Sequence, residues 1–178
     1  MEYPYLNGER IYLRLVEERD VAQLTKINNT AITRIMGDDD VPYPFSLETM
    51  SQFTKSNETM KNFAICRIKD DELIGSLAVY GINYQNSNCE IGLIVAEDAK
   101  RQGYGDEAMK IIIEFVFNYL PMNKIKLQVF SFNTAAINLY QQLGFTHEGT
   151  LKEEIFRFGT YQDLENYALL RSEWMNHH

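Results

Sequence analysis

Hydrophobic residues in the first half of the chain follow the period of two that is typical of half-buried β-strands. In residues 10–16, isoleucine and leucine alternate with tyrosine and arginine, so one face of an extended strand is apolar. Residues 63–69, 73–83 and 89–95 are also strand-like, and the first two flank a turn at Asp70-Asp71. The pattern therefore predicts an early strand followed by a three-stranded antiparallel meander.

The second half of the chain carries the strongest helical pattern. In residues 103–119 the apolar side chains recur at spacings of three and four, which predicts a helix with one buried face. Residues 133–143 form a second expected helix, and shorter helices are expected over residues 20–28 and from Ser46 onward. Three adjacent aspartates and two prolines predict a loop over residues 38–44.

Three more strand-like segments complete the second half. They cover residues 124–130, 145–153 and 162–170, and a turn is expected at residues 157–160. Strands interleaved with helices in this order indicate an α/β (α+β) fold with a mixed, twisted, seven-stranded sheet flanked by helices. At 178 residues, the chain is expected to form one domain over residues 1–178.

The charge balance excludes several classes of protein. The chain has 25 acidic and 17 basic side chains and a net charge of −8. We therefore expect no nucleic-acid partner and no membrane partner, whereas a cationic small molecule would be attracted. Cys66 and Cys89 stand singly in apolar segments, which predicts reduced, buried thiols in a cytoplasmic protein without a signal peptide. Two of the three histidines are the final two residues, so no metal site is expected.

The most informative segment links the meander to the long helix. Residues 100–108 contain Gly103 and Gly105 at the start of the helix, preceded by Lys100 and Arg101. Amide N–H groups at a helix N-terminus lack intrahelical acceptors, the helix dipole places partial positive charge there, and glycine lets a phosphate approach the backbone. The segment therefore predicts a phosphate-binding loop; the alternative is that the glycines are ordinary turn residues.

Two well-known phosphate-binding patterns fit this segment poorly. Gly103, Gly105 and Ala108 satisfy the dinucleotide spacing, but seven residues separate the preceding strand from the first glycine, and the next strand ends without the expected acidic residue. A P-loop is excluded because no Lys-Ser or Lys-Thr follows the second glycine. A dinucleotide-dependent enzyme is therefore the less favoured alternative.

Two motifs resemble those of the GCN5-related N-acetyltransferase (GNAT) superfamily. The loop KRQGYG at residues 100–105 is similar to the family's acetyl-CoA loop, Gln/Arg-x-x-Gly-x-Gly/Ala, although lysine stands at the first position. Residues 133–145, NTAAINLYQQLGF, resemble the signature N-x-x-A-x-x-L-Y-x-x-L-G-F. Residues 9–14 and 159–163 are similar to the branch that contains the ribosomal-protein N-terminal acetyltransferases and the spermidine acetyltransferases. The resemblance implies the GNAT fold.

The resemblance also implies a set of residues that hold acetyl-CoA as co-substrate. Backbone groups of the strand before the loop would pair with the pantetheine arm, and amides of the loop would hold the pyrophosphate. The expected cofactor-binding residues are Leu93, Ile94, Val95, Lys100, Arg101, Gln102, Gly103, Tyr104, Gly105, Asp106 and Asn133. The alternative role of Asn133 is that of an N-cap for its helix.

Two residues are candidates for proton transfer. Tyr140 lies two helical turns after Asn133, on the same face, and the resemblance makes it the acid that protonates the departing thiolate. Its alternative role is aromatic packing. Glu90 begins the strand that would pair with pantetheine, and its carboxylate would accept the amine proton there, directly or through water. Its alternative role is that of an exposed carboxylate at the end of the strand.

We therefore expect an N-acetyltransferase that moves an acetyl group from acetyl-CoA to a primary amine by direct attack. The acceptor would be a polyamine such as spermidine or the N-terminal amine of a protein. Three consecutive aspartates would attract a cationic acceptor or form a solvated loop, namely Asp38, Asp39 and Asp40. The alternative from another class is a non-catalytic acyl-CoA-binding sensor. An exposed strand edge would allow self-association into a homo-oligomer.

Overall fold

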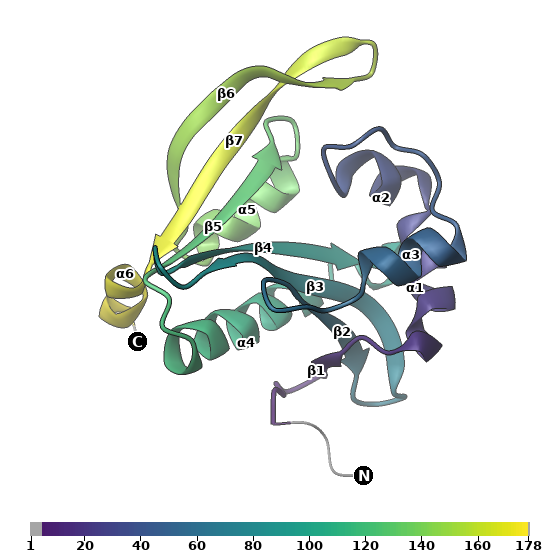
Figure 1. The fold of residues 1–178 in the computed structure, drawn as a ribbon, viewed down its shortest axis with the longest axis horizontal. Helices are drawn as coiled ribbons and strands as arrows, with labels where there is room; N and C mark the ends of the chain where they lie inside the picture. Colours follow the sequence, from purple (N-terminus) through teal and green to yellow (C-terminus); the bar gives the residue numbers. More distant parts are fainter. Residues whose placement is uncertain (1–4, 178) are drawn as a thin grey trace.

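A mixed, twisted, seven-stranded sheet forms the centre of the computed structural model, which describes residues 5–177 (Figure 1). Its strand order is β1-β2-β3-β4-β5-β7-β6. The strands are β1 Ile11–Leu15, β2 Lys61–Arg67, β3 Glu72–Asn83, β4 Asn88–Val95, β5 Lys124–Phe130, β6 Thr146–Arg157 and β7 Thr160–Leu170. All seven lie where the sequence pattern predicts strands, so the predicted fold class is confirmed.

Helices connect the strands and cover the sheet (Figure 1). They are α1 Val21–Asn28, α2 Ala31–Met36, α3 Leu47–Phe53, α4 Tyr104–Tyr119, α5 Thr134–Gln142 and α6 Arg171–Asn176. The pattern predicts four of them but not α2 and α6, which have only six residues each. In α2 the buried side chains are Thr33 and Arg34. A short helix that buries polar rather than apolar residues shows no hydrophobic periodicity.

The hairpin of β6 and β7 is longer than the pattern indicates. β6 continues to Arg157, whereas the sequence predicts an end at Glu153. Glu153 has a φ of 53° and lies where the register shifts between Leu151 and Ile155. From residue 146 to residue 154 nearly all side chains are exposed, and beyond this irregularity only Ile155 and Arg157 are buried, so a single apolar residue marks the end of the strand. The expectation that this strand ends at residue 153 is therefore wrong.

The strands β4 and β5 are parallel neighbours that separate after a short contact. Their pairing covers only residues 88–90 of β4 and 124–126 of β5. Beyond this contact the two strands point in different directions (Figure 1). Residues 91–95 stay paired with β3 on one side, and on their other side no strand of the described chain pairs with them. Backbone N–H and C=O groups on that edge are available to a ligand that lies like a strand.

The hydrophobic core fixes α4 against the sheet. The buried side chains of α4 follow the predicted spacing and are Tyr104, Ala108, Met109, Ile112, Ile113, Val116 and Phe117. A Cβ atom at Gly105 would lie 3.2 Å from Cδ2 of Leu93 and 3.7 Å from Cγ2 of Val95. Glycine is therefore needed where the first turn of α4 passes β4. This close packing places the N-terminus of α4 beside the unpaired edge of β4.

Candidate active site

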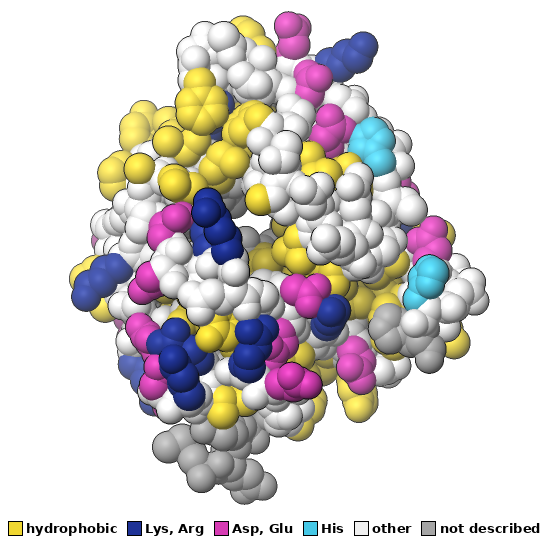
Figure 2. All heavy atoms as spheres, turned by 180° about the vertical axis from the view of Figure 1, so that it is seen from behind, with side chains coloured by type: hydrophobic (Ala, Val, Ile, Leu, Met, Phe, Trp, Pro, Cys, Tyr) yellow, Lys and Arg dark blue, Asp and Glu magenta, His cyan; other side chains and the backbone are white. Residues whose placement is uncertain are grey.

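A cleft of about 620 Å³ opens where β4 separates from β5. Its walls come from α2, β4, the loop before α4 and α5. The cleft brings together Tyr140 and all the predicted cofactor-binding residues except Gln102, namely Leu93, Ile94, Val95, Lys100, Arg101, Gly103, Tyr104, Gly105, Asp106 and Asn133. Figure 2 shows a hollow in the middle of the face opposite to that of Figure 1, with hydrophobic side chains in its walls and basic side chains near its rim.

The start of α4 has the backbone arrangement of an anion-binding site. Gly103 is the N-cap residue, its φ is 82°, and no side chain caps the helix. The first helical hydrogen bond runs from the N–H of Glu107 to the C=O of Gly103 at 3.1 Å. The N–H groups of Tyr104, Gly105 and Asp106 therefore have no intrahelical acceptor, and the helix dipole adds partial positive charge beside them. An anion in the cleft would accept hydrogen bonds from these groups.

The three residues before Gly103 shape this loop. Arg101 has a φ of 60°, in the left-handed region that a non-glycine residue rarely occupies outside functional or strained sites. Lys100 forms an ion pair with Glu97. The side-chain amide of Gln102 donates to the backbone carbonyl of Asp98 at 2.9 Å. Gln102 therefore supports the loop conformation, whereas Lys100 and Arg101 contribute the two cations of the cleft wall.

Arg10, just before β1, supports the loop from behind. Its Nη1 donates to the carbonyl of Gln102 at 2.6 Å, and its Nε and backbone N–H donate to the carboxylate of Glu107 at 3.0 and 2.8 Å. The guanidinium lies 4.8 Å from the ring centroid of Tyr104. Sequence reasoning missed Arg10 because 92 residues separate it from Gln102. The hydrogen bond holds the carbonyl oxygen of Gln102 toward Arg10. It thereby fixes the orientation of the peptide bond between Gln102 and Gly103.

Replacing Arg10 with alanine should weaken CoA binding about tenfold, because the loop amides lose a contact that fixes their direction. Isothermal titration calorimetry measures the Kd. Arg19→Ala is the matched control, since Arg19 pairs with Glu17 at 2.6 Å and both side chains are largely exposed. Equal Kd values for the two variants would show that Arg10 does not position the loop.

Asn133 and Tyr140 lie on α5, on the opposite side of the cleft from the loop. The Oδ1 of Asn133 accepts a hydrogen bond from the N–H of Ala136 at 3.2 Å, which confirms its predicted N-cap role. Tyr140 is only 9% exposed, and its ring lies 6.0 Å from that of Phe145. Burial raises the pKa of Tyr140 to about 12. The hydroxyl group therefore keeps its proton at neutral pH, as a general acid must.

Glu90 lies outside the cleft, at the point where β4 and β5 part. It lines a smaller pocket of about 280 Å³ together with side chains of β5, β6 and β7, namely Lys126, Leu127, Gln128, Glu148, Asn166 and Tyr167. The ammonium of Lys126 is 3.8 Å from Oε1 of Glu90. The structure therefore places Glu90 and Tyr140 in different pockets on the two sides of the strand separation.

Tyr80 lies beside Glu90 and is not among the predicted site residues. It is the direct cross-strand partner of Glu90 in the pairing of β3 with β4, and its Cε1 would lie 3.5 Å from a Cβ at Gly92. Burial raises the pKa of Tyr80, and the nearby charges of Glu90, Tyr140 and Asp39 raise it further. Charges from separate segments of the chain, those of Glu90 and Asp39, therefore act on the same tyrosine. The register of the meander is the signal that pairs Tyr80 with Glu90.

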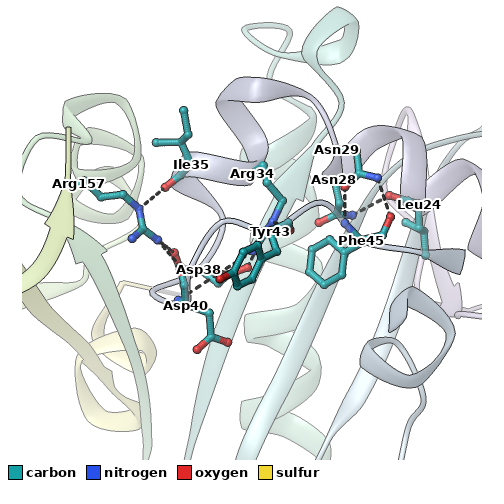
Figure 3. Close-up of polar contacts among 10 residues, drawn as sticks. All are labelled: Leu24, Asn28, Asn29, Arg34, Ile35, Asp38, Asp40, Tyr43, Phe45 and Arg157. Atoms are coloured by element: carbon teal, nitrogen blue, oxygen red, sulfur yellow. Dashed lines mark hydrogen bonds and ion pairs between the residues drawn. The ribbon is translucent and has the colours of Figure 1, made fainter. Parts of the chain in front are cut away.

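The three predicted aspartates of the loop after α2 have different surroundings. The carboxylate of Asp38 accepts hydrogen bonds from Nη1 and Nη2 of Arg34 at 2.8 and 3.1 Å (Figure 3). Asp39 and Asp40 are exposed. Since the guanidinium of Arg34 already occupies the carboxylate of Asp38, Asp39 and Asp40 are the carboxylates that remain for a cationic ligand. The negative charge of Asp39 contributes to the raised pKa of Tyr80.

A strand that parts from its parallel neighbour, a helix start with free amides and a buried tyrosine across the cleft together define an N-acetyltransferase of the GNAT type. The Acetyltransferase (GNAT) domain family matches residues 10–146, so the chain belongs to this family. The chain is therefore an acetyl-CoA-dependent enzyme, and the predicted resemblance is confirmed.

Several relatives cover nearly the whole chain. The spermidine N(1)-acetyltransferase of Vibrio cholerae is 27% identical over 170 residues, which are 95% of this chain and 98% of that protein. An uncharacterized prophage-derived N-acetyltransferase of Bacillus subtilis is 25% identical over 99% of both chains. The crystal structure of the Vibrio cholerae spermidine N-acetyltransferase with CoA and spermine superimposes with a TM-score of 0.87, at 26% identity, over 95% of this chain and 100% of that one.

The donor groups of the cleft fit CoA, which carries a diphosphate and an extended pantetheine arm. Free amides at the start of α4 suit the diphosphate, and the unpaired edge of β4 suits the amide groups of pantetheine. Within residues 5–177, no three histidine, cysteine, aspartate or glutamate side chains are grouped so that they could hold a metal ion. None of the helices in the same range combines the length and apolar composition of a membrane span.

Proposed function

We propose that this enzyme acetylates a primary amine of a polyamine by direct attack on the thioester of acetyl-CoA. The single observation that carries the proposal is the separation of β4 from β5. It leaves one strand edge free beside the amides of α4 and places Tyr140 on the facing helix. A strand-like donor molecule fits this edge, and an acceptor can approach from the side of Glu90.

Acetyl-CoA supplies an activated acetyl group, and the residues of the cleft supply its binding and orientation. The N–H groups of residues 104–106 would hold the diphosphate, with Arg101 and Lys100 as neighbouring cations. Backbone groups of residues 93–95 would pair with the pantetheine arm and face the carbonyl oxygen, so that developing negative charge on this oxygen receives a hydrogen bond.

Proton transfer is divided between two side chains. An amine attacks only in its neutral form, so the ammonium of the acceptor first gives a proton to Glu90, directly or through water. The nitrogen then forms a bond to the acetyl carbon while the bond from that carbon to sulfur breaks. Tyr140 gives its proton to the departing thiolate. The extra proton of the product amide restores Tyr140 through solvent, and Glu90 releases its proton to solvent. No side-chain nucleophile is required.

The acceptor is inferred from charge and from the relatives. Glu90 lines the pocket beside the strand separation, and Asp39 and Asp40 add exposed carboxylates in the loop after α2. A net charge of −8 further favours a polycation over a neutral amine. The Vibrio cholerae relative is a spermidine N(1)-acetyltransferase. We extend this acceptor class to the present chain.

Release of free thiol from acetyl-CoA tests the proposal. The assay compares spermidine, n-butylamine and peptides that start with serine or alanine, each at a saturating concentration of acetyl-CoA. We expect spermidine to give the highest kcat/KM. Turnover only with the peptides would replace the polyamine by a protein N-terminus. Tight CoA binding without thiol release from any amine would favour the non-catalytic sensor instead.

Replacing Glu90 with glutamine should lower kcat/KM for the amine about 10- to 100-fold near neutral pH, because the ammonium loses its proton acceptor. The loss should shrink as the pH rises toward the pKa of the amine, since more of the acceptor is then already neutral. Glu148→Gln is the matched control: Glu148 lines the same pocket but pairs with Lys124 at 2.7 Å. A pH-independent loss in E90Q would remove Glu90 from the proton transfer.

A further inference from the structure

Arg157 at the end of β6 is a buried guanidinium that holds a loop from the other end of the chain. It is 6% exposed. Its Nε donates to the carbonyl of Ile35 at 3.1 Å, and its Nη2 donates to the carbonyls of Asp38 and Asp40 at 2.9 and 2.7 Å (Figure 3). Its charge also lies 5.5 Å from the ring centroid of Phe130. Its Nη1 donates to the carbonyl of Phe156 at 3.0 Å. All these acceptors are neutral backbone carbonyl groups, so Arg157 fixes the position of the backbone rather than neutralising a carboxylate.

The carbonyls of Ile35, Asp38 and Asp40 lie on the two sides of two short segments of the chain. Ile35 and Asp38 flank Met36 and Gly37, which line the cleft. Asp38 and Asp40 flank Asp39, whose side chain is exposed. One side chain therefore fixes both a segment of the cleft wall and the backbone on the two sides of an acidic residue that follows this segment.

Hydrophobic contacts also connect the end of α2 to the β6–β7 hairpin. Phe130, Ile155 and Leu164 form a small hydrophobic cluster under the β6–β7 hairpin, and Met36 packs against it. On the other side of the loop, a Cβ at Gly37 would lie 3.5 Å from Cδ1 of Ile94 in β4. The hairpin, the α2 wall and the strand beside the cleft are therefore in continuous contact.

The rest of the loop is also held by an arginine. Arg34 is 7% exposed; its Nε donates to the carbonyl of Tyr43 at 2.7 Å, and its charge lies 4.3 Å from the ring centroid of Phe45. The same guanidinium pairs with the carboxylate of Asp38 at 2.8 Å, so Arg34 connects the loop to α2 at Asp38 and at Tyr43 (Figure 3). Asp39 is left between two clamped carbonyls with its own carboxylate free for solvent or a ligand.

We infer that Arg157 is a positioning residue for acceptor selectivity: it holds Asp39 where a second ammonium group of the acceptor binds while the first is acetylated. The inference rests on the proposed amine acetylation and deepens it, since it makes the acceptor a diamine or a longer polyamine. Arg157 acts through the loop, and Asp39 makes the contact with the acceptor.

The experiment compares Arg157→Gln with Arg171→Gln. Arg171 is the matched control because its guanidinium also donates only to backbone carbonyls among its hydrogen bonds in the described chain, those of Phe117, Met122 and Leu120, at a distant part of the fold. For each variant, kcat and KM are measured with n-butylamine and with 1,4-diaminobutane, and the Kd for CoA is measured by calorimetry.

In R157Q, KM for 1,4-diaminobutane should rise about tenfold, since one favourable charge interaction is lost. KM for n-butylamine and Kd for CoA should change by about threefold at most, because the variant loosens the cleft wall without removing a group that touches either ligand. R171Q should keep the wild-type ratio of the two KM values. Asp39→Asn should reproduce the R157Q shift, and the double variant should show no larger shift than either single variant, because both changes remove the same contact.

An unchanged ratio of the two KM values in R157Q, or additive shifts in the double variant, would overturn the inference. Amide hydrogen exchange gives a readout that does not need turnover: residues 36–40 should lose protection in R157Q but not in R171Q. If wild-type protein acetylates no amine, the proposed function fails. Calorimetric binding of 1,4-diaminobutane to the CoA-saturated protein then decides the inference, which fails if R157Q binds the diamine as tightly as wild type does.

Discussion

Replacing Tyr140 with phenylalanine should lower kcat about 100-fold, because the departing thiolate loses its proton donor. The change removes one oxygen atom and keeps the ring that packs near Phe145. The Kd for acetyl-CoA should therefore stay within about twofold. Burial raises the pKa of Tyr140 to about 12, so in the wild type the acid stays protonated at lower pH and no loss of rate from this group is expected below pH 10.

Single-turnover measurement of thiol release separates this chemical effect from product release. Tyr119→Phe is the matched control, since Tyr119 is 71% exposed at the end of α4. It should keep the wild-type rate. A Y140F rate within about twofold of wild type would leave Tyr140 as a packing residue, and the thiolate would then take its proton from water.

Replacing Gly103 with aspartate should raise the Kd for CoA by 100-fold or more, which corresponds to about 3 kcal/mol. Two effects act together. The φ of 82° is strained for a residue with a side chain, and the new Cβ would lie 3.0 Å from Nη2 of Arg10. The added carboxylate would also repel the diphosphate at the amides of α4. Isothermal titration calorimetry with CoA measures the change.

Gly159→Asp controls for the backbone strain. Gly159 has a φ of 75°, and an added Cβ there has no other atom within 4 Å. Its position in the turn between β6 and β7 leaves the start of α4 untouched, so CoA affinity should match wild type. Acetyl-pantetheine, which lacks the diphosphate, should be used equally well by G103D and wild type. A lower kcat/KM for it in G103D would show general damage to the cleft instead of lost diphosphate binding.

The strands and the long helix could be predicted because each has one apolar face. The alternation of residues 10–16 and the three-and-four spacing of residues 103–119 are direct consequences of burying one side of a regular element. The same reasoning fails for α2, which buries Thr33 and Arg34. It also fails at the far end of β6, where the register shifts near Glu153 and Ile155 is the single buried apolar residue that follows.

The cofactor side of the site could be predicted more completely than the acceptor side. The loop and the start of α4 form one continuous segment, so glycines and cations that act together are neighbours in the sequence. The acceptor side is assembled from distant segments. Arg157 reaches Asp40 across 117 residues, and Tyr80 meets Glu90 only through the register of β3 with β4. Contacts of this kind leave no periodicity or local motif in a single sequence.

The unpaired edge of β4 has a further consequence for the behaviour of the protein at high concentration. A free strand edge normally invites a neighbouring molecule to add a strand, which is a common start of aggregation. Here the edge lies in a cleft between α2 and α5, and the Met36–Gly37 segment lies over Ile94. The opening thus admits a thin extended coenzyme, while the flanking helices keep another folded chain away from the same hydrogen-bonding groups.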